Sequence, residues 1–139
     1  MKVKVALDDG AYMPSKAHEE DAGFDIRTPE DVYVGGLGSA TIDTGVHMAI
    51  PRGYVGFLKS KSGLNVKFDI TGEGVIDSGY TGSIVVKLYN SGSKSYRFER
   101  GDKLIQLVIL PIPEVELEKV DKLDEDTDRG DNGFGSSGR

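Results

Sequence analysis

The sequence predicts an all-β fold, a jelly-roll-like barrel or sandwich built from short strands. Three observations support this class. Apolar and β-branched residues occur in short runs with a period of two, and glycine or proline interrupts them about every 8–12 residues. No stretch of ten residues keeps the 3.6-residue period of an amphipathic helix. Many short strands between regular turn signals are typical of β-sandwiches and barrels.

The strand pattern is clearest in residues 40–50, where apolar side chains alternate with others in both halves of the segment. Pro111 and Pro113 should end the last apolar run. Beyond them, the alternation of Glu114–Val120 predicts one further strand. The remaining strand candidates are Lys2–Leu7, Tyr54–Lys59, Ser83–Asn90 and Lys103–Leu110.

Length and charge divide the chain into a body and a tail. A chain of 139 residues fits one domain of ordinary size. Residues 1–113 carry 14 acidic and 13 basic side chains, whereas residues 114–139 carry 9 and 4, so the tail holds most of the net charge of -6. The acidic stretch Asp121–Asp128 is typical of a solvated linker. We expect one domain over residues 1–120 and a flexible, glycine-rich C-terminal arm over residues 121–139.

Composition excludes several functions. The chain has no cysteine and only two histidines, so neither thiolate chemistry nor a histidine-rich metal site is expected. Its acidic balance does not suit binding to nucleic-acid polymers or anionic membranes. No apolar run approaches the roughly 20 residues of a membrane helix, and the N-terminus has no signal-peptide core. We therefore expect a cytoplasmic protein, or one of the host-cell interior if the source is viral.

Five short segments differ from plain strands and turns. In Asp21–Ile26 two carboxylates flank a glycine, although a capped turn before a strand would look the same. In Lys59–Leu64 hydroxyl and ammonium groups suit an anion, although solvated loops often have this composition. In Gly72–Gly82 the apolar pair before Asp77 should fix that carboxylate so that it can activate a water. The alternative there is a tight hairpin turn at residues 77–79.

The fourth segment contains a glutamine within an apolar run, and the fifth is the glycine-rich tail. Gln106 interrupts an otherwise apolar run in Arg100–Val108, and neighbouring backbone groups would be its simplest partners. In Arg129–Arg139 glycines and hydroxyls can donate to phosphate oxygens, and Phe134 can stack on a flat ring. A disordered tail and an Arg-Gly-Asp adhesion tripeptide are the alternatives for this segment.

In their order and spacing, these five segments resemble the five motifs of the trimeric, all-β dUTPase family. The resemblance runs from about Pro14 to Gly138. It implies a jelly-roll subunit, a homotrimer with three active sites, Mg²⁺ as cofactor, and hydrolysis of dUTP to dUMP and pyrophosphate. Such an enzyme limits uracil incorporation into DNA and supplies dUMP for dTMP synthesis.

The resemblance also implies roles for residues of the third segment. Asp77 would hold and activate the attacking water and would bond the 3′-hydroxyl of the deoxyribose. Tyr80 would pack under the sugar and leave no room for a 2′-hydroxyl. Backbone groups of the arm from Thr71 to Gly74 would read the edge of uracil, which discriminates strongly against the wrong base.

The other segments would bind the phosphates, the metal and the base. Ser62 would donate to the bridge between the α- and β-phosphates, Arg129 would grip the γ-phosphate, and Phe134 would stack on uracil in a neighbouring subunit's site. Asp25 and Gln106 would contact Mg²⁺ through water or would contact the phosphates, and Gln106 would thereby belong to the substrate-binding residues. Mg²⁺ suits such a site because it keeps several waters and sits mainly on substrate phosphates. The other substrate-binding residues that the resemblance implies are Lys61, Gly63, Val75, Ile76, Gly135, Ser136 and Ser137.

The chain departs from the family pattern at two positions. Lys61 stands where the family usually has arginine, which keeps the charge but loses the two-pronged geometry. Glu73 adds a negative charge where the family often has a small residue, and we expect its side chain to point to solvent.

Two other functions are alternatives. A dCTP deaminase, or a combined deaminase and diphosphatase, shares the fold but needs a glutamate for proton transfer at the base. A non-enzymatic jelly-roll module that binds a nucleotide or a regulatory protein is the second. The complete third and fifth segments favour dUTP hydrolysis over both.

Overall fold

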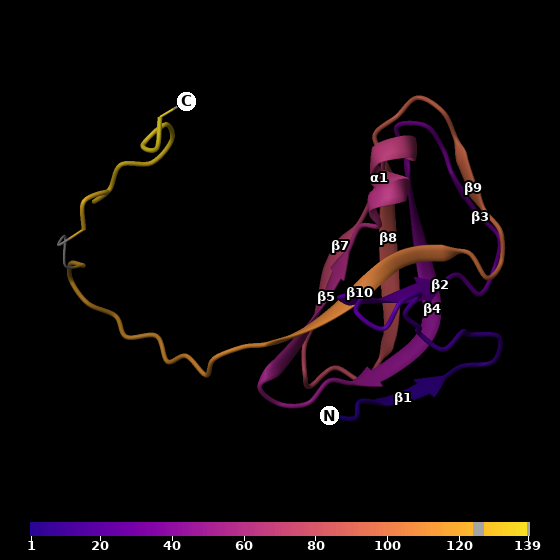
Figure 1. Cartoon of the computed structure of the whole chain (residues 1–139), viewed down its shortest axis with the longest axis horizontal. Coiled ribbons are helices and arrows are strands. Elements are labelled where there is room, and N and C mark those ends of the chain that lie inside the picture. The colour runs from indigo at the N-terminus through magenta and orange to yellow at the C-terminus, as the bar shows by residue number, and fades with distance from the viewer. Residues whose placement is uncertain (124–126, 139) are drawn as a thin grey trace.

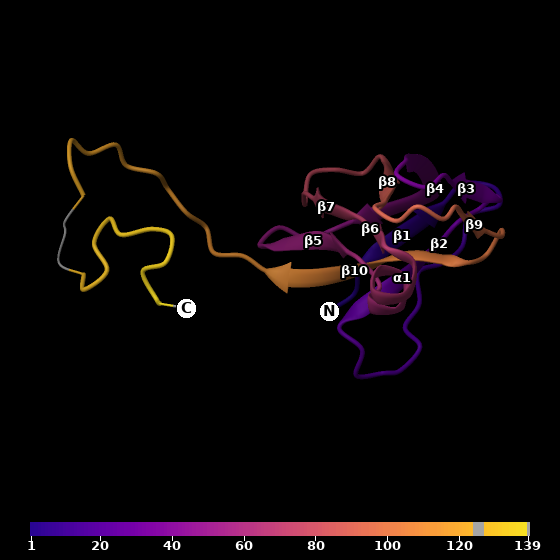
Figure 2. The same cartoon turned by 90° about the horizontal axis from the view of Figure 1, so that it is seen from above.

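In the computed structural model, which describes residues 1–123 and 127–138, the body of the chain is built from antiparallel strands. Two four-stranded sheets have the orders β1-β4-β8-β6 and β2-β10-β5-β7, and β3 and β9 form a small third sheet. Figure 1 shows β10 crossing in front of β8 and β4, and Figure 2 shows β4 and β8 in a layer above β10. The elements are β1 (Lys4–Leu7), β2 (Gly23–Arg27), β3 (Val32–Val34), β4 (Ser39–Ala49), β5 (Tyr54–Lys59), α1 (Ser62–Phe68), β6 (Ile70–Thr71), β7 (Glu73–Ile76), β8 (Ser83–Asn90), β9 (Tyr96–Phe98) and β10 (Lys103–Pro111). The all-β fold class is therefore confirmed, and the arrangement is compatible with a jelly roll.

The core lies between the two four-stranded sheets, as the period-two pattern predicts. Strand β8 shows this most clearly, because every second residue from Ile84 to Asn90 is buried and those between are exposed. Strand β4 contributes Ile42, Val46 and Met48 to the same core. The opposing sheet supplies Ile26, Leu58, Ile76, Leu104, Ile105 and Leu107.

A bulge interrupts β4 and keeps both of its halves on the core. The pairing with β8 shifts between Asp43 and His47, so that four steps along β4 correspond to two along β8. Gly45 within the bulge has φ +68°, a conformation that glycine adopts without strain. The Thr44 hydroxyl donates to the Ile84 carbonyl at 2.6 Å, which satisfies a buried polar group inside the bulge.

The seven-residue helix α1 was not predicted from the sequence. None of its residues is buried, so it has no apolar stripe from which a helical period could be recognised. Lys61 is its N-cap residue, and Asp69 ends it in the left-handed conformation with φ 57°. Among the described residues, no helix has the length and hydropathy that a membrane crossing requires.

The predicted strand at Glu114–Val120 is wrong. Strand β10 ends at Pro111 as expected, but residues 112–120 form no strand, and the Leu117 side chain is 91% exposed. An alternating sequence forms a strand only beside a partner, and the described chain offers none here. Figure 1 shows the chain leaving the two packed sheets at this point, so that residues 112–123 extend away from them. The division of the chain at residue 120 stays a prediction.

The turn at residues 77–79 is confirmed, but it does not close a hairpin. The Tyr80 amide donates to the Asp77 carbonyl at 3.1 Å, as in a tight turn. However, β7 pairs with β5 in one sheet, and β8 pairs with β4 and β6 in the other. The turn therefore carries the chain from one layer of the fold to the other.

The alternation of β8 can be tested with two neighbouring valines. Val86 is 1% exposed and Val85 is 49% exposed, so Val86→Ala removes buried methyl groups and Val85→Ala does not. We expect Val86→Ala to lower the free energy of unfolding by about 2 kcal/mol, and Val85→Ala to change it by less than about 0.5 kcal/mol. Urea denaturation of both variants measures the difference, and equal losses would contradict the assignment of faces.

Candidate active site

Residues from four of the five segments align in one row across the second sheet. Asp25 of β2 lies opposite Gln106 of β10, and Gln106 lies opposite Lys59 of β5. Lys59 in turn lies opposite Glu73 of β7. Directly opposed residues of adjacent strands project from the same face of a sheet. The pairing therefore brings the first, fourth and second segments, and the beginning of the third, to one face.

The carboxylate of Asp25 is the centre of this row. It is only 5% exposed, and its two oxygens accept hydrogen bonds from the ammonium groups of Lys61 and Lys103, the latter at 2.9 Å. Burial alone would raise the pKa of Asp25, but the hydrogen bonds and charges of the two lysines outweigh it and hold this pKa below its usual range. Asp25 therefore stays ionised at neutral pH. Through its two lysine partners it links β2 to β10 and to the start of α1.

Gln106 has the backbone partner that the simplest interpretation of the sequence predicts. Its Nε2 donates to the Ser60 carbonyl at 3.1 Å. Gly23 leaves the space that this side chain needs, because a Cβ at Gly23 would lie 2.5 Å from Gln106 Oε1. Strand β2 therefore carries a glycine two residues before Asp25, where the Gln106 side chain lies against its backbone.

Ser60 joins the second segment to the third. Its hydroxyl accepts from the Gly72 amide at 3.0 Å and donates to the Gly72 carbonyl at 3.1 Å. Beside it, Lys59 Nζ pairs with Glu73 Oε1 at 2.7 Å. The Glu73 side chain is largely exposed, as expected, but it also pairs with this lysine, which lowers the pKa of Glu73. Ser60 and Lys59 thus fix the arm that leads into β7.

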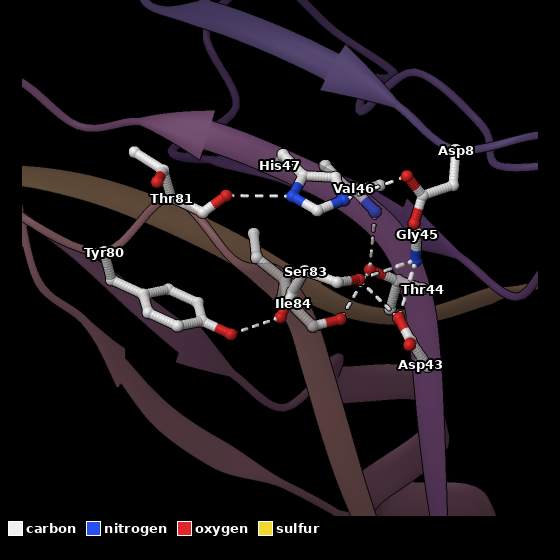
Figure 3. Close-up of polar contacts among 10 residues, drawn as sticks. All are labelled: Asp8, Asp43, Thr44, Gly45, Val46, His47, Tyr80, Thr81, Ser83 and Ile84. Atoms are coloured by element: carbon white, nitrogen blue, oxygen red, sulfur yellow. Dashed lines mark hydrogen bonds and ion pairs between the residues drawn. The ribbon is translucent and has the colours of Figure 1, made fainter.

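The third segment continues along β7 into the turn that carries Asp77 and Tyr80. Strand β7 is the edge of its sheet, so one side of its backbone has no strand partner among the described residues. Asp77 follows directly and is exposed. The Tyr80 ring is 44% exposed, and its hydroxyl donates to the Ser83 carbonyl at 2.7 Å (Figure 3). The turn therefore presents a carboxylate and an aromatic ring to solvent.

The tail residues do not meet the rest of the site within one chain. Arg129 Nε donates to the Asn132 carbonyl at 2.8 Å, and Phe134 is fully exposed. Gly130, Gly135 and Gly138 have φ values of 56°, 80° and 84°, so glycine turns shape this part of the tail. Gly135, Ser136 and Ser137 are exposed as well.

The chain also separates its two key carboxylates. Asp25 and Glu73 lie three strand spacings apart in the row, and Asp77 follows four residues after Glu73 along β7. At about 4.8 Å per strand and about 3.3 Å per residue, the Cα atoms of Asp25 and Asp77 are roughly 20 Å apart. One chain therefore presents three separate groups of site residues: the row with Ser62 and Gly63 beside it, the β7 turn, and the tail.

Sequence reasoning missed Lys103 and Ser60 as members of the site. Strict alternation puts Lys103 and Gln106 on opposite faces, since they are three residues apart. A bulge between Lys103 and Ile105 changes the phase and allows both to approach Asp25. Nothing in the local sequence marks this bulge. Ser60 lies inside the second segment, but its importance depends on the distant Gly72.

The described residues fit an indirectly held metal better than a directly ligated one. Residues 1–123 and 127–138 contain no group of three or more acidic or histidine side chains arranged so that it could hold a metal ion directly. The Asp25 carboxylate is ionised, but each of its oxygens already accepts from an ammonium group. Together with the amide of Gln106, it suits water-mediated contact with a hydrated Mg²⁺.

The comparisons with known proteins agree with this arrangement. The dUTPase family model matches residues 9–138. The deoxyuridine 5'-triphosphate nucleotidohydrolase of Gloeothece citriformis is 39% identical over 99% of this chain and 97% of the relative. A mutant dUTPase of Staphylococcus bacteriophage 80alpha, solved with dUpNHpp, is 34% identical with a TM-score of 0.92 and covers 99% of both chains.

A second solved structure adds a metal to the comparison. A mutant dUTPase of phage phi11 of S. aureus is 33% identical with a TM-score of 0.82, over 88% of this chain and 98% of that one. That structure describes the coordination of a structural Mg(II) ion. The protein is thus an all-β nucleotide hydrolase by its fold and its relatives. The chain belongs to the dUTPase family, as the five segments predicted.

Because Asp25 is held in ion pairs, the free energy of unfolding should depend on pH in the acidic range. Because the folded pKa of Asp25 is lowered, its contribution to stability is present above the unfolded pKa and is lost as pH falls through the folded one. Lys103→Gln removes one cationic donor and should raise the folded pKa. Loss of stability should then begin at a higher pH than in the wild type.

Urea denaturation between about pH 3 and 7 checks this expectation. Lys94→Gln is the control, because this substitution removes the same charge at an exposed position in the loop between β8 and β9. If the two variants have the same pH dependence, Lys103 does not stabilise the ionised form of Asp25.

Proposed function

We propose that this protein hydrolyses dUTP to dUMP and pyrophosphate in a Mg²⁺-dependent reaction, as a homotrimer whose active sites each combine residues of three chains. The observation that carries the proposal is the match of nearly the whole chain to dUTPases, including one solved with dUpNHpp at a TM-score of 0.92. By limiting dUTP, the reaction would restrict uracil incorporation into DNA and would supply dUMP for dTMP synthesis.

Asp77 acts as the general base in this proposal. Water attacks the α-phosphorus, a bond forms between the water oxygen and phosphorus, and the bond to the bridging oxygen of pyrophosphate breaks. The proton of the water passes to the Asp77 carboxylate. The tight turn after β7 supports this role, because it holds an exposed carboxylate at the end of a strand whose preceding residue, Ile76, is anchored in the core.

The same turn and the edge of β7 recognise the nucleoside. Apart from Gly72, whose amide and carbonyl are bonded to Ser60, the backbone from Thr71 to Ile76 lies at sheet edges and offers donors and acceptors that suit the polar edge of uracil. Tyr80 presents its ring beside Asp77 and packs under the deoxyribose, where a 2′-hydroxyl would have no space. Asp77 also accepts from the 3′-hydroxyl.

The row on the second sheet binds the phosphates. Ser62 and Gly63 begin α1 beside Lys61, and the Ser62 hydroxyl donates to the bridge between the α- and β-phosphates. Mg²⁺ would neutralise phosphate oxygens when bound, and Asp25 and Gln106 would hold its outer waters. The Lys61 ammonium group forms an ion pair with Asp25 in the described chain. It therefore contributes charge near the phosphates rather than the two-pronged contact of an arginine.

Three chains are needed because one chain separates the parts. The row, the β7 turn and the tail do not meet within the described chain, and the tail leaves the barrel in extended form (Figure 1). In a trimer, the row of one chain faces the turn of a second, and the tail of a third closes the site. Arg129 then reaches the γ-phosphate, Phe134 stacks on uracil, and Gly135, Ser136 and Ser137 cover the phosphate chain.

Phosphate release in the presence of added pyrophosphatase tests the proposed reaction. With Mg²⁺, we expect dUTP to be hydrolysed far faster than dATP, dCTP, dGTP or dTTP. Ammonia release from dCTP would instead indicate a deaminase, and inactivity toward all five nucleotides would indicate a binding module.

Asp77→Asn should lower kcat for dUTP by a factor on the order of 10³ or more and leave nucleotide affinity within about threefold. The amide keeps the shape and the hydrogen bond to the sugar but cannot take a proton from water. Stopped-flow turnover and calorimetry with dUpNHpp measure the two quantities. Normal turnover of this variant would exclude Asp77 as the base.

Deletion of residues 129–139 should leave a folded trimer with little activity. The deleted segment follows the acidic linker, and its described residues add nothing to the core. Circular dichroism and analytical ultracentrifugation test the fold and the assembly, and the phosphate assay tests the activity. An unfolded product would show that the tail is structural.

A further inference from the structure

His47 of β4 directs both of its ring nitrogens at hydrogen-bond acceptors. Nδ1 lies 2.8 Å from the Thr81 carbonyl oxygen, and Nε2 lies 3.0 Å from Asp8 Oδ1 (Figure 3). Neither oxygen can donate a proton. A neutral imidazole carries one N–H and can satisfy one of them, whereas an imidazolium carries two and satisfies both. The geometry therefore selects the protonated ring.

The charges around His47 favour the same state. The hydrogen bond with Thr81 and then that with Asp8 raise the pKa of His47, and the nearby carboxylate of Asp43 adds to this effect. Desolvation lowers this pKa by less than either hydrogen bond raises it, but by more than the charge of Asp8 or of Asp43 raises it. Lys4 of β1 lines the same surface hollow of about 460 Å³ and is the cation on that side. With 29% of the His47 side chain exposed, solvent partly screens all these charges.

Thr81 follows Tyr80, the expected wall beneath the sugar. Two residues further along, Ser83 is attached to β4 by bonds that do not need His47: the Ser83 hydroxyl donates to Asp43, and the Gly45 amide donates to the Ser83 hydroxyl at 3.1 Å. The Tyr80 hydroxyl is in turn bonded to the Ser83 carbonyl. The contact of His47 with Thr81 is thus a second attachment of this loop to β4, and it is made by the residue directly after Tyr80.

We propose that His47 is a positioning residue for nucleotide selection: in its protonated form it holds the Thr81 carbonyl, and with it the backbone that sets the Tyr80 ring under the sugar. The proposal rests on the proposed function, in which Tyr80 excludes a 2′-hydroxyl. His47 itself contacts neither substrate nor metal in this scheme.

Deprotonation breaks the Thr81 contact rather than the Asp8 contact. The remaining proton stays on Nε2, because a hydrogen bond to a charged carboxylate is stronger than one to a neutral carbonyl. The lone pair of Nδ1 then faces the Thr81 oxygen, and two acceptors repel each other. Because the folded pKa of His47 is raised, its support of the turn is complete below the unfolded value of about 6.5 and is lost as pH rises through the folded value.

Steady-state kinetics from about pH 6 to 9 test the consequence for selection. In the wild type, we expect KM for dUTP to rise about two- to fivefold as pH increases, a change of the size expected for the loss of one hydrogen bond. The ratio of the inhibition constant of UTP to this KM should fall over the same range, because the sugar is then less well discriminated. His47→Asn keeps a donor at the place of Nδ1 but does not titrate, so its KM and its selectivity should be independent of His47 ionisation. His47→Ala should show the weaker, high-pH behaviour throughout.

His18→Gln is the matched control, because it removes the other histidine of the chain and should keep the wild-type profile. Identical profiles for wild type and His47→Asn would overturn the proposal, as would a profile that disappears in His18→Gln.

An NMR titration tests the contact without any reaction. In the His18→Gln background the single histidine resonance reports His47, and the Gly82 amide reports the peptide group that contains the Thr81 carbonyl. We expect both to titrate with one midpoint, and Asp8→Asn should move both midpoints to lower pH. A Gly82 amide that does not follow His47 would overturn the proposal even in an active enzyme. The coupled titration in a protein that does not hydrolyse dUTP would overturn the proposed function and leave the His47–Thr81 contact established.

Discussion

A buried carboxylate needs cationic partners, and the arrangement of the second sheet follows from this constraint at Asp25. An unpaired charge at this depth would cost several kcal/mol. Lys61 and Lys103 each supply a partner for one oxygen of the carboxylate, Lys61 from the cap of α1 and Lys103 from the start of β10. The N-terminal end of α1 and the bulge in β10 are both placed where these ammonium groups can reach Asp25. The row that includes Gln106 then follows from the strand pairing.

The sequence predicted those parts of the fold in which alternation decides the structure. The faces of β4 and β8 follow from period two, and the glycine in the β4 bulge permits the shift that a strict pattern would not allow. One element was missed and one prediction was wrong, both for physical reasons. The helix α1 is too short and too exposed to show a period, and Glu114–Val120 alternates without a partner strand. Local pattern describes what a segment can form, whereas pairing decides what it does form.

The candidate site was predicted by motif order rather than by chemistry alone. Asp77 and Gln106 each had a plausible structural explanation, and Gln106 does have the backbone partner that this explanation required. Lys103 could not be found from spacing, because the bulge changes the face on which it lies. The contact of His47 with Thr81 joins residues 34 positions apart, and only the paired register of β4 and β8 brings them together.

The bulge between Lys103 and Ile105 also determines where insertions and deletions in this chain can be tolerated during evolution. A single insertion or deletion in β10 moves every later side chain to the other face. Removal of the extra residue would point Gln106 into the core and Leu107 into solvent, and no adjustment of neighbouring side chains repairs such an exchange. The turns and the linker after Pro111 have no such alternation to preserve. Evolutionary changes of chain length should therefore accumulate in the loops and the tail, while β10 varies by substitution alone.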